Sequence, residues 1–267
     1  MSPKACFPLV AIDVGNSQIK AGLFAEPPGS EAELPRPSRT VSLDAEHWEP
    51  VEIALWLAPR KPTDVTWWLA SVRHDAARRL QEWLDQERPA AQHRWLSYQH
   101  LRLPIDLQEP NQVGIDRLLG ALAADRLRPQ ERPAVIIDLG SAITVDVVSA
   151  QGHFTGGAIL PGLRMSARAL HEFTDQLPDV SMSQLEQAPP LVGTSTDEAI
   201  ASGLFWGAVG AIRSLVEQLN EQMRSEPFIV LTGGAAASVV EAIGLDVTFE
   251  PDLVLSGMAL AASQMVE

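Results

Sequence analysis

The organisation of this chain is most visible in the stretch Val135-Ile-Ile-Asp-Leu-Gly-Ser-Ala-Ile-Thr-Val-Asp146. Its apolar run predicts a buried strand that ends at Asp138, turns tightly around Gly140 and returns as a second strand. Leu9-Val-Ala-Ile-Asp-Val-Gly-Asn-Ser-Gln-Ile-Lys20 repeats this order near the N-terminus. A third copy without the acid, Phe228-Ile-Val-Leu-Thr-Gly-Gly-Ala235, predicts a third hairpin. Three such hairpins indicate a nucleotide held between two related halves.

The spacing of apolar residues predicts the elements around these turns. In the first half we expect strands at 7–14, 19–25, 39–43, 64–72 and 94–97, and helices at 47–57 and 74–86. A helix at 114–127 leads to the second half, where we expect strands at 134–139, 142–149, 153–160, 227–232 and 246–249, and helices at 163–174, 197–223, from 235 and from 253. The repeated order predicts a duplicated α/β architecture.

Composition limits the class of protein and its partners. The chain has 267 residues, 46% of them hydrophobic, which is enough for a packed core. A formal net charge of −14 argues against nucleic acid or an anionic membrane as a main partner. The single cysteine, Cys6, fits a reducing compartment. With no signal-peptide pattern and no uninterrupted apolar run of membrane-spanning length, we expect a soluble, cytoplasmic protein.

The first turn has the chemistry of a phosphate site. Gly15 lets backbone N–H groups converge on an anion, since no Cβ blocks the approach. Asn16 and Ser17 add side-chain donors, and Lys20 adds a cation. Asp13 would repel a phosphate, so its place here makes sense only with Mg²⁺, bound directly or through water.

A lone Asp-x-Gly hairpin is more often a simple turn, so only its repetition in the chain indicates a ligand site. Asp138-Leu-Gly-Ser141 supplies the second copy, and Gly233-Gly234 ends a further strand. Together they favour a site for a magnesium nucleotide. The sequence contains no G-x-x-x-x-G-K-[ST], G-x-G-x-x-G or G-x-S-x-G motif, and its six histidines show no metal-ligand spacing.

Asp116, in Val113-Gly-Ile-Asp-Arg-Leu118, is the candidate base that a kinase needs for its acceptor hydroxyl. It falls in the first turn of a predicted helix, where the macrodipole favours its charged form. Gly114 leaves room for a substrate, and Arg117 offers a guanidinium for a carboxylate or phosphate. Alternatively, Asp116 only caps the helix beside an exposed arginine.

Two more stretches admit either a ligand or a structural role. Gly156-Gly-Ala-Ile-Leu-Pro-Gly162 could form a wall of the acceptor site, or a tight corner between a strand and a helix. Gly193-Thr-Ser-Thr-Asp-Glu198 opens the long helix, and capping by Ser195 or Thr196 explains it without a ligand.

Taken in order, these motifs resemble type III pantothenate kinases of the actin-like ATPase and sugar kinase superfamily. The resemblance runs nearly end to end. Its stretches are DVGNSQIK from Asp13, VGIDR from Val113, IDLGSAITVD from Ile137, GGAILPGL from Gly156, GTSTDEAIASG from Gly193 and LTGG from Leu231.

The resemblance implies an α/β fold of two similar actin-like ATPase (ribonuclease H-like) domains of βββαβαβ type, 1–112 and 113–267, flanking a nucleotide cleft. It implies an enzyme that uses ATP to phosphorylate pantothenate to 4′-phosphopantothenate, the first step of coenzyme A biosynthesis. It also implies a homodimer that needs Mg²⁺ and a monovalent cation, K⁺ or NH₄⁺.

Individual roles follow from the matched motifs. Asp116 would be the proton acceptor, Asp138 would bind the monovalent cation, and Asp13 would act on Mg²⁺. The implied pantothenate contacts are Gly114, Ile115, Asp116, Arg117 and Thr196. The implied ATP contacts are Asp13, Gly15, Asn16, Ser17, Gln18, Lys20, Gly140, Ser141 (usually Thr in the family), Gly233 and Gly234.

One departure concerns the acceptor. Where the family has a tyrosine that contacts pantothenate, this chain has Leu107. Losing that hydrogen bond would cost roughly 1 kcal/mol of binding. A related kinase of another small alcohol or a sugar therefore remains an alternative, as do a non-catalytic regulator with the same fold and an actin-like filament protein.

Overall fold

The computed structural model describes residues 7–28, 30, 33–87 and 92–265, so Cys6 lies outside the described residues. The chain forms two compact units. The first comprises the chain up to Leu127 together with the segment from Asp252, and the second is Arg128–Pro251. Each unit is built on a five-stranded sheet.

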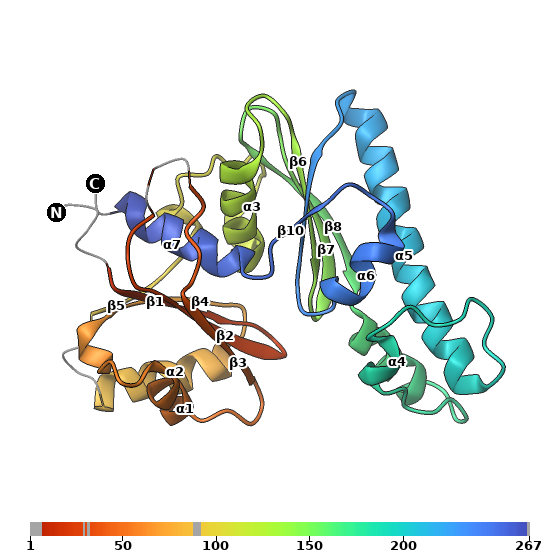
Figure 1. The fold of residues 1–267 in the computed structure, drawn as a ribbon, viewed down its shortest axis with the longest axis horizontal. Coiled ribbons are helices and arrows are strands. Elements are labelled where there is room, and N and C mark those ends of the chain that lie inside the picture. The colour runs from red at the N-terminus through yellow and green to blue at the C-terminus, as the bar shows by residue number, and fades with distance from the viewer. Residues whose placement is uncertain (1–6, 29, 31–32, 88–91, 266–267) are drawn as a thin grey trace. The chain divides into compact units, whose positions relative to one another are not determined.

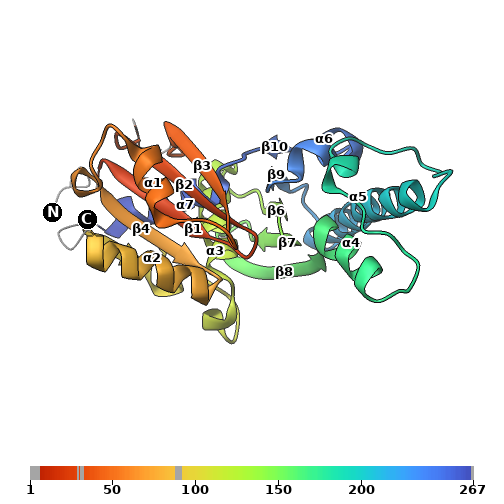
Figure 2. The same ribbon diagram turned by 90° about the horizontal axis from the view of Figure 1, so that it is seen from below.

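The sheet of the first unit has the strand order β3-β2-β1-β4-β5. Its strands are β1 (Leu9–Val14), β2 (Gln18–Phe24), β3 (Arg39–Asp44), β4 (Thr66–Ser71) and β5 (His93–Trp95). Its helices are α1 (Pro50–Leu57), α2 (His74–Glu87), α3 (Ile115–Leu127) and α7 (Leu253–Met265). In Figures 1 and 2, α1 and α2 lie on one face of this sheet, and in Figure 1 α7 lies on the other.

Alternating side chains of the strands explain these layers. Val10, Ile12 and Val14 of β1 are fully buried in one cluster with side chains of α1 and α2. On the other face α7 packs against β1, β2 and β4. Gly22 permits this packing, because a Cβ there would lie 3.1 Å from the Leu255 side chain of α7.

The second unit repeats the design with the order β10-β9-β6-β7-β8. Its strands are β6 (Ala134–Leu139), β7 (Ala142–Val148), β8 (Phe154–Pro161), β9 (Phe228–Thr232) and β10 (Thr248–Phe249). Its helices are α4 (Leu163–Glu172), α5 (Thr196–Met223) and α6 (Ala236–Ile243). The core joins one face of the sheet to α5 and α6, which lie side by side in Figure 2.

The two sheets have the same pairing pattern, which confirms the predicted duplication. β1 pairs antiparallel with β2 and parallel with β4, and β6 pairs antiparallel with β7 and parallel with β9. Asp13 and Asp138 are each the fifth residue of these central strands, and both strands have the same order of buried and half-buried residues.

The prediction of a third hairpin was wrong. β9 runs parallel to β6 and continues through Gly233 and Gly234 into α6, so it matches β4 rather than β1. The next strand, β10, follows α6 and pairs parallel with β9, so this connection is a crossover and not a hairpin.

The division into units also differs from the expected boundary between residues 112 and 113. α3 and α7 pack closely on one another within the first unit, because Gly257 has no Cβ to collide with the backbone of Leu119. The chain thus leaves the first unit after α3 and returns to it in α7.

The 28-residue helix α5 is long and apolar enough to cross a membrane by length and composition alone. Phe205, Val209 and Ile212 of this helix are instead buried in the core of the second unit. Burial against a sheet explains its apolar character, and core helices commonly pass the same test.

Candidate functional site

The turn between β1 and β2 presents exposed polar residues on a fixed backbone. Val14 pairs with Ile19, and the N–H of Gly15 donates to the carbonyl oxygen of Gln18 at 3.0 Å. A Cβ on Gly15 would lie 2.9 Å from that same oxygen, so a side chain would disturb the turn. Asn16, Ser17 and Gln18 are exposed and can meet a ligand.

Asp13 and Lys20 stand directly opposite one another across β1 and β2, and both are half-buried. A carboxylate and an ammonium group are therefore placed at the base of the turn. Both residues belong to the predicted phosphate motif, whose role stays a prediction.

The segment after β4 binds the turn from the side. The Val72 N–H donates to the carbonyl oxygen of Val14 at 3.1 Å, and Arg73 Nη1 donates to the carbonyl oxygen of Asn16 at 2.8 Å. Arg73 also binds Asp75, and this hydrogen bond raises the pKa of Arg73 and lowers the pKa of Asp75. Sequence reasoning did not identify Arg73, which lies outside the motifs.

Asp116 is the second residue of α3 and lies in the first turn of a helix, as predicted. Its Oδ1 accepts a hydrogen bond from the Arg117 N–H at 2.9 Å, and a Cβ on Gly114 would lie 2.5 Å from this oxygen. Such a Cβ would also lie 3.7 Å from the Val72 side chain. Because Val72 is bonded to Val14, the start of α3 and the first turn lie at one edge of the first unit.

Within the second unit, two predicted glycine turns meet at Asp138. Gly233 has a φ of +101°, which glycine adopts far more readily than other residues. A Cβ there would collide with Asp138 Oδ1 and with the backbone of Leu139. The N–H of Ala235 donates to the carbonyl oxygen of Leu139 at 3.1 Å, which fixes the approach.

The turn after β6 is also tied to α4. The Gly140 N–H donates to the carbonyl oxygen of Ala142 at 3.1 Å. A Cβ on Gly162 would collide with the carbonyl oxygen of Ser141, so the corner before α4 presses on this turn. The close packing accounts for Gly162 without a ligand, the second of the two roles considered for this stretch.

The N-terminus of α5 is capped by side chains of its own first residues. Ser195 is the N-cap and accepts from the Glu198 N–H at 3.3 Å, and Thr196 is exposed as the first helical residue. Glu198 Oε2 accepts from both the N–H and the hydroxyl of Thr194 at 2.7 Å. The pKa of Glu198 is lowered, and the hydrogen bond from the Thr194 hydroxyl is the largest cause.

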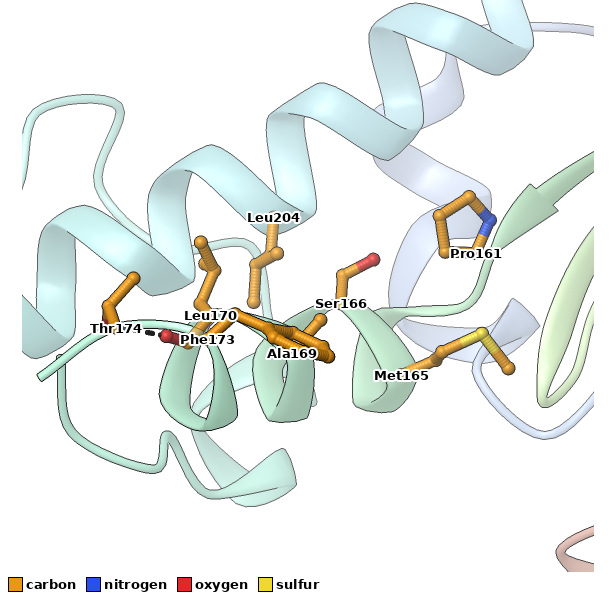
Figure 3. A pocket seen from close by; sticks show the side chains of 8 residues that line it. All are labelled: Pro161, Met165, Ser166, Ala169, Leu170, Phe173, Thr174 and Leu204. Atoms are coloured by element: carbon orange, nitrogen blue, oxygen red, sulfur yellow. Dashed lines mark hydrogen bonds between the residues drawn. The ribbon is translucent and has the colours of Figure 1, made fainter.

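An open apolar hollow of about 600 Å³ lies between α4 and α5 and is lined by residues of both helices and by Pro161 of β8. Figure 3 shows Met165, Phe173 and Leu204 around it. It lacks the convergent polar groups of a substrate site.

Each unit has one carboxylate that could bind a metal ion together with a nucleotide. In the described part of the chain, no group of three or more His, Cys, Asp or Glu side chains is placed to hold a metal by itself. Asp13 and Asp138 offer carboxylate oxygens beside glycine turns, the donors that Mg²⁺ and K⁺ accept, with phosphate or water completing the shell.

The fold defines a class. Two like units with this sheet order form the actin-like ATPase and sugar kinase fold. The activator of 2-hydroxyisocaproyl-CoA dehydratase from Clostridium difficile, with bound ADPNP, aligns over 96% of this chain and 94% of its own at a TM-score of 0.52 and 12% identity. MreB 5 of Spiroplasma citri, bound to AMPPNP, aligns over 93% and 94% at 0.50 and 12%.

The family follows from sequence. A model of the type III pantothenate kinase family matches residues 9–218, so this chain belongs to that family. Type III pantothenate kinases from Paramagnetospirillum magneticum and Syntrophotalea carbinolica are 42% and 39% identical over 136 and 134 residues. These matches span 51% and 50% of this chain, and about half of each relative, 50% and 51%.

Proposed function

We propose that this protein transfers the γ-phosphoryl group of ATP to the primary hydroxyl of pantothenate, which yields 4′-phosphopantothenate for coenzyme A synthesis. The observation that carries the proposal is the family match over residues 9–218, which contains both acid-tipped glycine turns and Asp116. The placement of Asp13 and Asp138 at the same position of two equivalent strands supports it.

The glycine turns are assigned to ATP. In the first unit, Gly15 to Gln18 would offer backbone and side-chain donors to the phosphates, with Lys20 as a cation beside them. In the second unit, Gly140 and Ser141 would contact ATP, and Gly233-Gly234 would lie beside the adenosine.

Asp116 is assigned to the proton of the acceptor hydroxyl. Asp116 lies in the first turn of α3, where the positive end of the helix dipole favours negative charge. An ionised carboxylate can orient the hydroxyl and take up its proton as the oxygen attacks the γ-phosphorus in line. Gly114, Ile115, Arg117 and the exposed Thr196 are assigned to pantothenate, with Arg117 for its carboxylate.

Two cations complete the proposed site. Asp13 would hold Mg²⁺, directly or through water, and Asp138 would hold K⁺ or NH₄⁺. When bound, these ions offset the negative charge of the phosphates. Asp13 and Asp138 supply hard oxygen ligands, and their carboxylates lie beside the turns that we assign to the nucleotide.

A cytoplasmic homodimer is part of the proposal, and we assign the interface to the second unit. Phe173, Leu191 and Val192 there are 83%, 71% and 78% exposed. Gly203 and Gly207 of α5 are exposed, and a Cβ on either would meet nothing within 4 Å. Glycine inside a helix costs about 1 kcal/mol against alanine, and it lets a second helix approach closely. Sedimentation equilibrium would give twice the mass of one chain.

Product analysis tests the activity. Purified protein incubated with Mg²⁺, ATP and pantothenate should yield 4′-phosphopantothenate, identified by phosphorus NMR and mass spectrometry. The Asp116→Asn protein serves as a control for contaminating kinases. Recovery of unmodified pantothenate, from a folded protein that consumes ATP on another alcohol, would contradict the proposal.

That other alcohol is the second candidate, because of Leu107. This half-buried residue stands where the family has the tyrosine that contacts pantothenate. Parallel incubations with hexoses and small alcohols at equal concentration separate the two candidates.

A further inference from the structure

Three carbonyl oxygens of the Gly15–Gln18 turn accept hydrogen bonds from within the first unit. The oxygen of Gln18 accepts from the Gly15 N–H at 3.0 Å, and that of Ser17 from the Ala45 N–H at 3.1 Å. The third, on Asn16, accepts from Arg73 Nη1 at 2.8 Å. Two donors belong to the backbone, so Arg73 is the donor that a substitution can remove.

Arg73 is held in one orientation by Asp75. Nε and Nη2 of Arg73 donate to Oδ1 and Oδ2 of Asp75 at 2.9 and 3.2 Å, which makes a bidentate pair. Nη1 remains for Asn16, 57 residues away in sequence. The side chain of Arg73 is 21% exposed, so packing restricts it as well.

We propose that Arg73 is a positioning residue for the triphosphate of ATP, acting through the backbone of the Gly15–Gln18 turn. The inference rests on the proposed function of that turn as a phosphate site. A carbonyl oxygen that faces a phosphate repels it, whereas an N–H attracts it. Binding the Asn16 oxygen on the protein side leaves the amide edge of the turn for the ligand. Preorganised donors of this kind bind an anion without a cost of reorganisation.

In the second unit, the position equivalent to Arg73 is an alanine. Ala235 donates to the carbonyl oxygen of Leu139 as Val72 donates to that of Val14. The residue after Val72 is Arg73, whereas the residue after Ala235 is Ala236, which carries no donor. Loss of Arg73 should therefore weaken ATP binding at the first turn and leave the turn at Asp138 unchanged.

Four variants separate positioning from charge and from general stability. Arg73→Met removes both the hydrogen bond to Asn16 and the charge. Arg73→Lys keeps the charge but lacks the guanidinium group that binds Asp75 and Asn16 together. Asp75→Asn keeps Arg73 but weakens the pair that orients it. Arg78→Met is the matched control, since Arg78 lies in α2, which begins directly after Arg73, with its side chain 74% exposed and paired only loosely with Glu82 at 3.9 Å.

Steady-state kinetics on the full chain give the main result. We expect Arg73→Met to raise KM for ATP on the order of tenfold, as for loss of a hydrogen bond to a charged group. KM for pantothenate and Tm should stay at wild-type values. Arg73→Lys and Asp75→Asn should give smaller rises, and Arg78→Met none. A Tm drop confined to Arg73→Met leaves Arg73→Lys and Asp75→Asn to decide.

The inference is overturned if Arg73→Met matches Arg78→Met in KM for ATP, or if Arg73→Lys restores the wild-type value, because charge alone would then suffice. Amide hydrogen exchange in the absence of nucleotide tests, independently of activity, whether Arg73 orders the turn. Gly15 and Ala45, whose N–H groups are bonded in the turn, should exchange faster in Arg73→Met than in Arg78→Met. Equal exchange would overturn the inference, whereas faster exchange in a protein with no activity on pantothenate would contradict only the proposed function.

Discussion

At the residue scale, Asp13 and Asp138 occupy the same position in two strands of identical topology. The local pattern of apolar run, acid and glycine was enough to predict both turns and the start of α3. Arg73 could not be predicted, because its partner Asn16 is 57 residues away and only the parallel pairing of β1 with β4 joins them. The close approach of Gly233 to Asp138 could not be predicted either, because these residues are also far apart in sequence.

Replacing Asp116 with asparagine tests the proposed base. Asparagine keeps an oxygen that can accept the Arg117 N–H, so the start of α3 should stay folded. The lost proton acceptor should lower kcat by roughly 10²–10⁴. Circular dichroism and Tm serve as the folding control, and an unchanged kcat would show that Asp116 is not the base.

Replacing Gly233 with alanine tests the close packing at Asp138. The φ of +101° and the collision with Asp138 Oδ1 and Leu139 should together destabilise the protein by about 2 kcal/mol or more. Gly234→Ala, at an exposed position without positive φ, is the matched control. Urea unfolding of both variants measures the difference, and equal midpoints would refute this reading of the turn.

At the element scale, helices and strands with clear periodicity were predicted within a few residues, including the first residue of α4 and the last of α5. The failure at β9 has a physical cause. A glycine pair after an apolar run ends a strand equally well before a hairpin or a crossover helix, and only the partner strand decides between them.

The pKa of Glu198 predicts how the start of α5 responds to acid. Its bond from Thr194 holds this pKa below the ordinary value near 4.5, so the bond stabilises the folded state above that value. The contribution is lost as pH falls through the lower folded pKa. Glu198→Gln should thus lower Tm at pH 7 and have less effect near pH 3. A Tm difference that does not shrink in acid would contradict this.

At the scale of the whole molecule, the division into units was the feature least visible in the sequence. A linear boundary at 112 and 113 follows the motif order, but α7 returns from the end of the chain to cover the first sheet. The packing of α7 on this sheet joins residues that are far apart in sequence, so no local sequence pattern predicts it. Leu255, Met258 and Ala259 of α7 are buried there.

A chain that ends at Pro251 tests this arrangement. Without α7, the apolar residues of β1 that face it would meet water, and the first unit should lose cooperative unfolding while the second keeps its sheet. Differential scanning calorimetry with amide exchange of β1 and β6 measures both units. Full protection of β1 in the truncated chain would contradict the assigned role of α7.

A coupled ADP-release assay shows whether this chain phosphorylates pantothenate, as we propose. With Mg²⁺ and ATP present, we predict ADP release that depends on pantothenate, rises when K⁺ or NH₄⁺ replaces Na⁺, and is much slower with hexoses. A folded protein that releases ADP no faster with pantothenate than without it would contradict the claim.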